Sequence, residues 1–292
     1  MSDAESKPAR RISRFVGPFH NISYYAPEMK TFADRGIAGY WRAYMAYRSA
    51  PMGRAPAAAV EAAFYNFSAR TVAAAIPSAW LAMTPAEAIE LRDECVDRAL
   101  RRSLGELTDS AEVAEADALV RQAIEDQPGP GRVLYAAHTE LPWPTTPHMS
   151  LWHGCTLWRE YRGDGHNIAL AAANLDGVEC HVLVAARTGP KTAATIRTIR
   201  GWSNDEWAGA VERLHQRGLV EPDGSFTEAG RTLRREIEDK TDELATAPCE
   251  RVGPDAVDRL CELMTPIVGH MVETGAIAGS WPPDTAKTPP QA

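Results

Sequence analysis

Apolar residues recur with the period of an α-helix along most of this 292-residue chain. Tyr40, Tyr44 and Tyr47 lie at positions i, i+4 and i+7, so we predict a helix within residues 32–47 that has an aromatic face. The sequence Thr-Pro-Ala-Glu at 84–87 supplies a capping hydroxyl, a proline for the first turn and a glutamate at the third position, which predicts the start of another helix. The first part of the chain is therefore expected to be helical.

The middle of the chain contains glycines and an aspartate that predict a break between two helices. We expect one helix over residues 148–162, ending at Gly163, and a second helix that begins near His166 with Asp164 as its N-cap. The apolar run at 179–186 fits either a short strand or a buried helical turn, and its periodicity does not distinguish the two.

A hairpin signal follows in the last third of the chain. Asn204 is the predicted N-cap of a helix over 207–217. Residues 219–221 and 225–227 are short strand candidates on either side of the tight turn Pro-Asp-Gly. We therefore predict a helix-turn-helix with a small β-hairpin wing, followed by a further helix.

These patterns predict a mainly α fold, in which a helical N-terminal domain is followed by a winged helix-turn-helix and a C-terminal helix. The predicted divisions are a mobile N-terminus (1–10), the helical domain (11–130), a histidine-rich helical segment packed on it (131–190), the winged-helix domain (191–245), the C-terminal helix (246–278) and a disordered, proline-rich tail (279–292).

Composition narrows the choice of partners and compartment. The chain has 31 Lys and Arg against 39 Asp and Glu, and the net charge of −8 opposes nonspecific attraction to nucleic acid or to an anionic membrane. The five cysteines are widely spread and form no C-x-x-C pair, which favours reduced thiols. Because no secretory signal and no long apolar run are visible, we expect a cytoplasmic protein without a membrane partner.

Residues 211–220, with the later Thr-Glu-Ala-Gly-Arg at 227–231, resemble the winged helix of MarR-type regulators. In that family the start of the recognition helix enters the major groove of DNA. Here that start carries Asp205 and Glu206, and residues 191–243 hold nine basic and eleven acidic side chains. We therefore rank DNA binding below a packing or dimerisation role for this module.

The whole chain resembles a SalK-like helix-turn-helix family of actinobacteria. The longest matching piece is Leu-Trp-His-Gly-Cys-Thr-Leu-Trp-Arg-Glu-Tyr-Arg-Gly-Asp-Gly-His at 151–166, and shorter pieces lie at 19–28, 39–44, 48–53 and 141–144. The resemblance implies a helical N-terminal domain followed by a winged helix, and it brings no reaction with it.

Five of the eight histidines lie between His138 and His181, and this density of ligand and acid–base side chains is the best signal of a site. We predict His153, Glu160 and His166 as candidate catalytic residues, with His153 and His166 as candidate ligands of a metal or a haem iron. His166 in the first turn of a helix would stay neutral. No H-x-x-x-H or H-E-x-x-H spacing supports a zinc site.

Two further groups of side chains are candidate ligand contacts. Arg159 and Arg162 can hold a carboxylate or phosphate of a ligand. Tyr24, Tyr40 and Trp41 can line a polar pocket, because buried hydroxyls need partners. A helix corner without function and an ordinary aromatic core are the competing interpretations, and the sequence leaves them open.

The leading hypothesis is a small-molecule-binding helical protein that uses the His/Glu/Arg cluster in 138–181, with a metal- or haem-dependent enzyme as one form of it. In this hypothesis the winged helix has a structural or dimerisation role. The alternative is a ligand-responsive, MarR-like transcriptional regulator that binds DNA. A homodimer fits either hypothesis.

Overall fold

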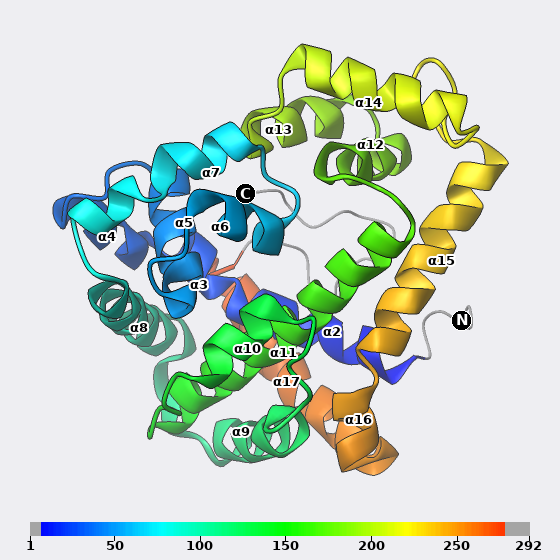
Figure 1. Cartoon of the computed structure of the whole chain (residues 1–292). Helices are drawn as coiled ribbons and strands as arrows, with labels where there is room; N and C mark the ends of the chain where they lie inside the picture. Colours follow the sequence, from blue (N-terminus) through cyan, green and yellow to red (C-terminus); the bar gives the residue numbers. More distant parts are fainter. Residues whose placement is uncertain (1–6, 278–292) are drawn as a thin grey trace.

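The computed structural model describes residues 7–277, and every regular element in that range is a helix (Figure 1). No single helix in these residues is both long and apolar enough to cross a bilayer, and the two helix pairs that pass this test jointly are bent by 99° and 98°. The predicted tail at 279–292 and residues 1–6 of the predicted mobile N-terminus lie outside the described residues.

The elements in chain order are α2 (Pro8–His20), α3 (Ile22–Tyr25), η1 (Pro27–Lys30), α4 (Thr31–Asp34), α5 (Tyr40–Ser49), η2 (Ala50–Met52), α6 (Ala57–Phe64), α7 (Ala69–Ala75), η3 (Ser78–Leu81), α8 (Pro85–Leu104), η4 (Gly105–Asp109), α9 (Ala111–Ile124), α10 (Val133–Thr139), α11 (Pro147–Ala172), α12 (Gly177–Thr188), α13 (Pro190–Arg200), α14 (Asn204–Gln216), α15 (Glu228–Leu244), α16 (Ala247–Val252) and α17 (Pro254–Glu273).

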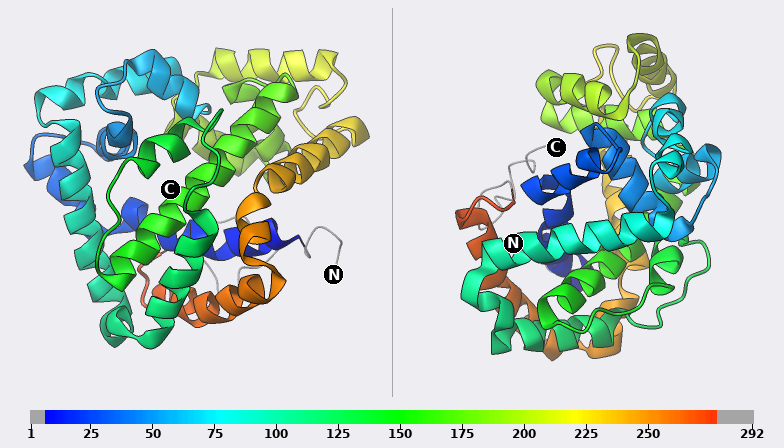
Figure 2. Two further views of the ribbon diagram at one scale, coloured as in Figure 1. Left: turned by 60° about the horizontal axis from the view of Figure 1, so that its bottom comes forward. Right: turned by 90° about the vertical axis from the view of Figure 1, so that its left-hand side faces the viewer.

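Helix α11 runs through the middle of the molecule, with α2, α9, α10 and α15 packed around it (Figures 1 and 2). Trp152 and Trp158 on this helix are among the largest fully buried side chains in the described part of the chain. A helix segment that is covered on all sides needs no polar face, and α11 accordingly buries every residue from 148 to 158. The helix therefore provides the frame on which the other elements are placed.

The predicted break at Gly163 is wrong, because α11 continues without interruption from residue 147 to 172. The glycines serve close packing instead. A Cβ on Gly165 would lie 3.0 Å from the guanidinium of Arg132 and 3.3 Å from Leu244. Arg132 donates hydrogen bonds to the carbonyl oxygens of Tyr161 on α11 and Leu244 at the end of α15. A glycine inside a helix can thus mark the approach of a neighbour instead of a helix end.

Asp164 caps a helix, but not the one that follows it in sequence. Its Oδ2 accepts a hydrogen bond of 2.9 Å from the backbone N–H of Tyr135, in the first turn of α10. The free N–H groups at a helix start can donate to any nearby carboxylate, whether it is local or distant in sequence. Asp164 therefore joins α10 to α11.

The predicted β-hairpin wing is also wrong, although the mainly α assignment is right. The described residues contain no strand, and Val220 and Phe226 form one isolated antiparallel bridge. The segment between α14 and α15 is too short to extend this bridge, because Thr227 already serves as the N-cap of α15. A lone two-stranded ribbon without further strands is marginal in water. The segment 179–186, which fitted a strand or a helix, lies in α12.

The buried apolar side chains form two clusters. One cluster joins helices α2 to α11 with α16 and α17, and the other joins the end of α11 with α12, α14 and α15.

The turn between α13 and α14 contacts the helical body at α7. The carbonyl of Arg200 accepts hydrogen bonds from the backbone N–H of Ser68 (3.0 Å) and from Thr71 Oγ1 (3.4 Å). Gly201 follows with a φ of +73° and packs directly against Thr71.

Gly201→Ala should lower the free energy of unfolding by about 2 kcal/mol more than Gly218→Ala does. Both glycines follow a helix at positive φ, +73° and +70°, so both variants pay a similar backbone strain of about 1 kcal/mol. Only at Gly201 would the new Cβ meet a neighbour, 1.9 Å from Thr71 Oγ1, whereas nothing lies within 4 Å at Gly218. Urea unfolding of the two variants measures the difference. Equal losses would contradict the packing of this turn on α7.

Candidate functional site

The three predicted catalytic residues lie on α11 but do not come together. His153 and Glu160 are seven residues apart and His166 is six further on, so about 20 Å along the helix axis separates the two histidines. They cannot share one metal or haem iron. Within residues 7–277 no group of three or more His, Cys, Asp or Glu side chains is placed to hold a metal ion.

The two histidines lie in separate surroundings. His153 is buried with its ring edge-on to Trp143 at 4.8 Å, and burial lowers its pKa to about 3. His166 Nδ1 lies 2.9 Å from Thr241 Oγ1 on α15, and burial lowers its pKa to about 4. His166 lies in the interior of α11, so burial and not a helix N-terminus keeps it neutral. Each histidine is explained by packing between α11 and a neighbouring element.

Glu160 is the centre of a buried charge cluster. Its carboxylate, 1% exposed, accepts hydrogen bonds from Arg48 Nη2 at 3.1 Å and from Arg159 Nη1 at 2.8 Å. Burial raises the pKa of Glu160, but the guanidinium groups of Arg159 and Arg48 outweigh it and hold the pKa well below its usual range. Glu160 is therefore an ionised partner of two arginines and not a proton donor.

Aromatic side chains surround this carboxylate. Tyr44 accepts a hydrogen bond of 3.0 Å from Arg48, and the ring of Tyr24 lies 5.1 Å from that of Tyr44. The hydroxyl of Tyr24 also bonds His20 Nε2 at 2.9 Å. Of the predicted pocket residues, Tyr24 thus belongs to the cluster.

The other two predicted pocket residues lie further out. Trp41 is half-buried and contacts Tyr44 edge-on, with the ring centres 5.6 Å apart. Tyr40 is 46% exposed, and its hydroxyl donates to the carbonyl of Tyr24 at 3.0 Å. The structure therefore brings Tyr24, Trp41 and Arg159 to one place and leaves Tyr40 at its rim.

Two arginines of this cluster were missed in the sequence analysis as ligand contacts. Arg48 lies one turn after Tyr44 on the aromatic face of α5, and this basic residue on an aromatic face was an available signal. Arg200, the last residue of α13, lies with its guanidinium 4.1 Å from the centre of the Phe67 ring, and the Phe67 ring lies 5.7 Å from that of Tyr44. Nothing in the local sequence indicates that contact. We call Arg48, Arg159, Arg200 and Glu160, with Tyr24 and Tyr44, the arginine cluster.

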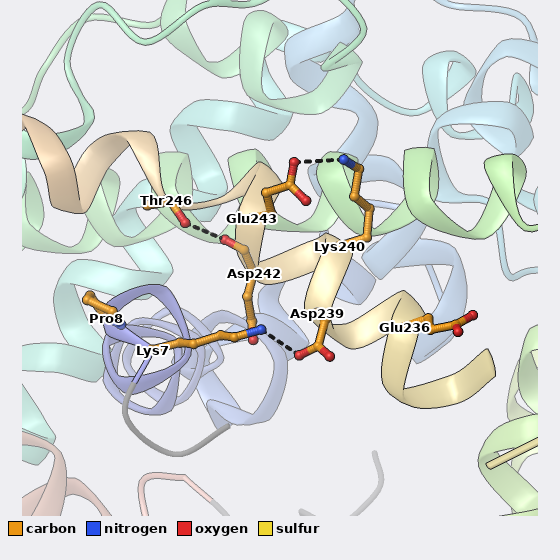
Figure 3. Close-up of a pocket in the computed structure, with 8 residues that line it drawn as sticks. All are labelled: Lys7, Pro8, Glu236, Asp239, Lys240, Asp242, Glu243 and Thr246. Atoms are coloured by element: carbon orange, nitrogen blue, oxygen red, sulfur yellow. Dashed lines mark hydrogen bonds and ion pairs between the residues drawn. The ribbon is translucent and has the colours of Figure 1, made fainter. Parts of the chain in front are cut away.

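We had expected Arg162 to bind a ligand together with Arg159. Instead, Arg162 contacts α15. Its Nη2 lies 3.2 Å from Asp242 and 3.5 Å from Glu238, and Arg10 of α2 also pairs with Asp242 at 2.5 Å. A groove of about 610 Å³ lies beside this contact (Figure 3). Four carboxylates and two lysines are among its lining residues, so it does not suit an anion; they are Lys7, Pro8, Glu236, Asp239, Lys240, Asp242, Glu243 and Thr246.

Helices α13 and α14 form a helix-turn-helix joined by residues 201–203. Ser203 and not Asn204 is the N-cap of α14, in a capping box with Glu206. The carboxylate of Glu206 also binds Arg70 of α7, with one contact at 3.0 Å. Its negative charge is therefore paired, whereas Asp205 is exposed.

Glu160→Gln should lower the free energy of unfolding at pH 7 by about 3 kcal/mol, because it leaves two arginines without their carboxylate. The folded-state pKa of Glu160 is depressed, so its stabilisation is complete above the unfolded pKa of about 4.3 and is lost as the pH falls further. Urea titrations from neutral to acid pH should therefore show the difference from wild type shrinking below that pH. The exposed Glu212→Gln is the matched control, expected within about 0.5 kcal/mol of wild type. A pH-independent difference would be evidence against the ion pairs.

Comparisons with known proteins give one result for the chain as a whole. No curated protein and no solved structure matches it. A model of a helix-turn-helix family matches residues 9–278, nearly the full length, which confirms the coarse part of the resemblance and points to DNA as a partner, against the low rank we gave it. The chain belongs to this helix-turn-helix family.

Proposed function

We propose that the protein is a transcriptional regulator that binds DNA through α13 and α14. Membership of a helix-turn-helix family, together with the α13–turn–α14 arrangement, carries this proposal. In such pairs the second helix enters the major groove and the first crosses the phosphate backbone. The resemblance to SalK-like proteins and to MarR-type regulators supports the same role, without a β-hairpin wing.

The charge of the exposed surface supports contact with the DNA backbone. No Asp or Glu lies between Glu179 and Asp205, an interval that holds Arg187, Lys191 and Arg197 in addition to Arg200 of the arginine cluster. Arg187 and Lys191 are exposed at the corner between α12 and α13. Because lysine and arginine contacts to phosphate supply most of the affinity for DNA, this corner is the expected anchor of the first helix.

The main objection to DNA binding is reduced by the contacts of α14. The carboxylates of Asp205 and Glu206 would both repel phosphate if they were free. Glu206 is paired with Arg70 and with its own helix start, so among the described residues of this helix start Asp205 is the exposed carboxylate without a partner. The side chain of Arg197 lies beside it, donating to Asn204 at 2.7 Å.

The enzyme form of the leading hypothesis, small-molecule binding by the His/Glu/Arg cluster, has no comparable support. The separation of His153, Glu160 and His166 along α11 gives it no set of catalytic groups in one place.

A homodimer stays a prediction that fits the regulator, because helix-turn-helix proteins commonly bind paired half-sites. Sedimentation of the full chain, with and without DNA, measures it.

Selection of bound fragments from random DNA by the purified full chain should yield a specific sequence. With that sequence, Arg187→Glu combined with Lys191→Glu should weaken binding at least about tenfold. The slope of log affinity against log salt should become shallower by about 2, because two phosphate contacts are lost.

The matched control is Lys30→Glu combined with Arg35→Glu. It makes the same change of charge at exposed positions of the helical domain, on η1 and at the end of α4. It should leave the salt slope unchanged. Failure to select any sequence at low salt, or equal losses in the two double variants, would contradict the proposed DNA-binding surface.

A further inference from the structure

We propose that the arginine cluster binds the carboxylate of a small aromatic acid, and that this ligand is the effector of the regulator. The effector role rests on the proposed function, whereas ligand binding by the cluster can be tested without DNA. The side chains of the site come from three helices, with Arg48 on α5, Arg159 on α11 and Arg200 at the end of α13.

The cluster holds more positive than negative charge. The guanidinium groups of Arg48 and Arg159 bind one carboxylate, that of Glu160, and Arg48 also donates to the hydroxyl of Tyr44. The third guanidinium, that of Arg200, lies over the ring of Phe67 and has no carboxylate on it among the described residues. The next carboxylate, Asp164, is occupied by a backbone N–H of α10. Charges inside a protein are normally paired, so an excess of two positive charges indicates a place for an anion.

The pKa of Tyr44 reflects the same excess. Burial raises the pKa of this phenol, but Arg48, Arg159 and Arg200 outweigh burial and lower it below its usual value. An anion bound among the three arginines would experience the same favourable potential.

Arg159 is partly accessible to solvent at the edge of the cluster. Arg159 retains 28% of its side-chain exposure, although the carboxylate that it contacts is 1% exposed. In the described part of the chain Arg159 uses only Nη1, on Glu160, so its Nε and Nη2 can form a planar pair of donors to a carboxylate. The rings of Tyr24 and Trp41 are half-buried and pack on Tyr44. Such rings favour an aromatic body on the ligand.

Arg200 connects this site to the DNA-binding helices. It is the last residue of α13, and its carbonyl holds the turn against α7. A carboxylate bound by Arg159 and Arg200 together would tie α13 to α11. A ligand that prefers one position of α13 over another shifts the population of the two, and thereby the affinity for DNA.

Calorimetric titration of the full chain without DNA tests the site. The probes are benzoate, phenylacetate and indole-3-acetate, with benzamide as the neutral analogue of benzoate and inorganic phosphate as an anion without a ring. At least one aromatic carboxylate should bind saturably, and benzoate at least about tenfold more tightly than benzamide, the amount expected for charge-assisted hydrogen bonds. Binding of benzamide as tightly as benzoate, or of phosphate alone, would overturn the proposal.

Single arginine-to-methionine variants test which residues bind the carboxylate. Arg159→Met and Arg200→Met should each weaken carboxylate binding by about 10- to 100-fold. Arg159→Met leaves Glu160 paired with Arg48, and thermal unfolding of each variant confirms the fold first. Arg162→Met is the matched control, because Arg162 is on the same helix and contacts α15 instead. An equal loss in the Arg162 variant would overturn the assignment.

The effector role is measured separately, as the affinity for the selected DNA with and without saturating ligand, and a change of at least about fivefold is expected. Carboxylate binding without any DNA binding would overturn the regulator and leave the site standing. DNA binding without carboxylate binding would overturn the site alone. Unchanged DNA affinity in the presence of bound ligand would overturn the effector role.

Discussion

The buried carboxylate of Glu160 sets the main constraint on this fold. An ionised group inside a protein loses its hydration, and only close, hydrogen-bonded partners of opposite charge compensate that loss. Arg159 reaches Glu160 from the same helix and Arg48 reaches it from α5. The position of α5 on α11 is therefore determined by charge as well as by apolar packing. Tyr44 connects this pair to α13 through ring packing, because it accepts a hydrogen bond from Arg48 and packs on Phe67, over which the guanidinium of Arg200 lies.

The continuity of α11 passes this constraint to both apolar clusters. The same helix that holds Glu160 in the larger cluster ends in the cluster formed with α12, α14 and α15. On its other side, Arg162 and His166 bind Asp242 and Thr241 of α15, and Gly165 admits Arg132. The helix-turn-helix is thus attached to the helical body along α11 and at the turn of Gly201. Any shift of α13 must break the polar contacts that hold it to the helical body. A small ligand bound beside α13 would change the free energy of that shift.

Local signals in the sequence were sufficient for some elements and ambiguous for others. The capping box at 84–87 and the helical character of the first part of the chain are confirmed, since they depend on neighbours in sequence. Gly163 and Asp164 were misassigned, because a glycine suits a helix end or a close neighbour equally, and a carboxylate can cap a distant helix. The pairing of Arg48 with Glu160 spans 112 residues, and only the tertiary fold reveals it.

The net charge of a sequence window also differs from the charge of a surface. Residues 191–243 combine the basic α13 with α15, and acidic side chains of α15 pair with α2 and α11 at a distance from the turn of α13 and α14. Asp239 binds Lys7, and Asp242 binds Arg10 and Arg162. The basic corner at Arg187 and Lys191 is consequently more positive than the window suggests. In a protein of net charge −8, such a corner attracts phosphate only at short range, because the whole molecule is repelled at distances where the charges are not resolved. Nonspecific DNA binding would therefore be weak, and stable binding would require the close fit of a specific site.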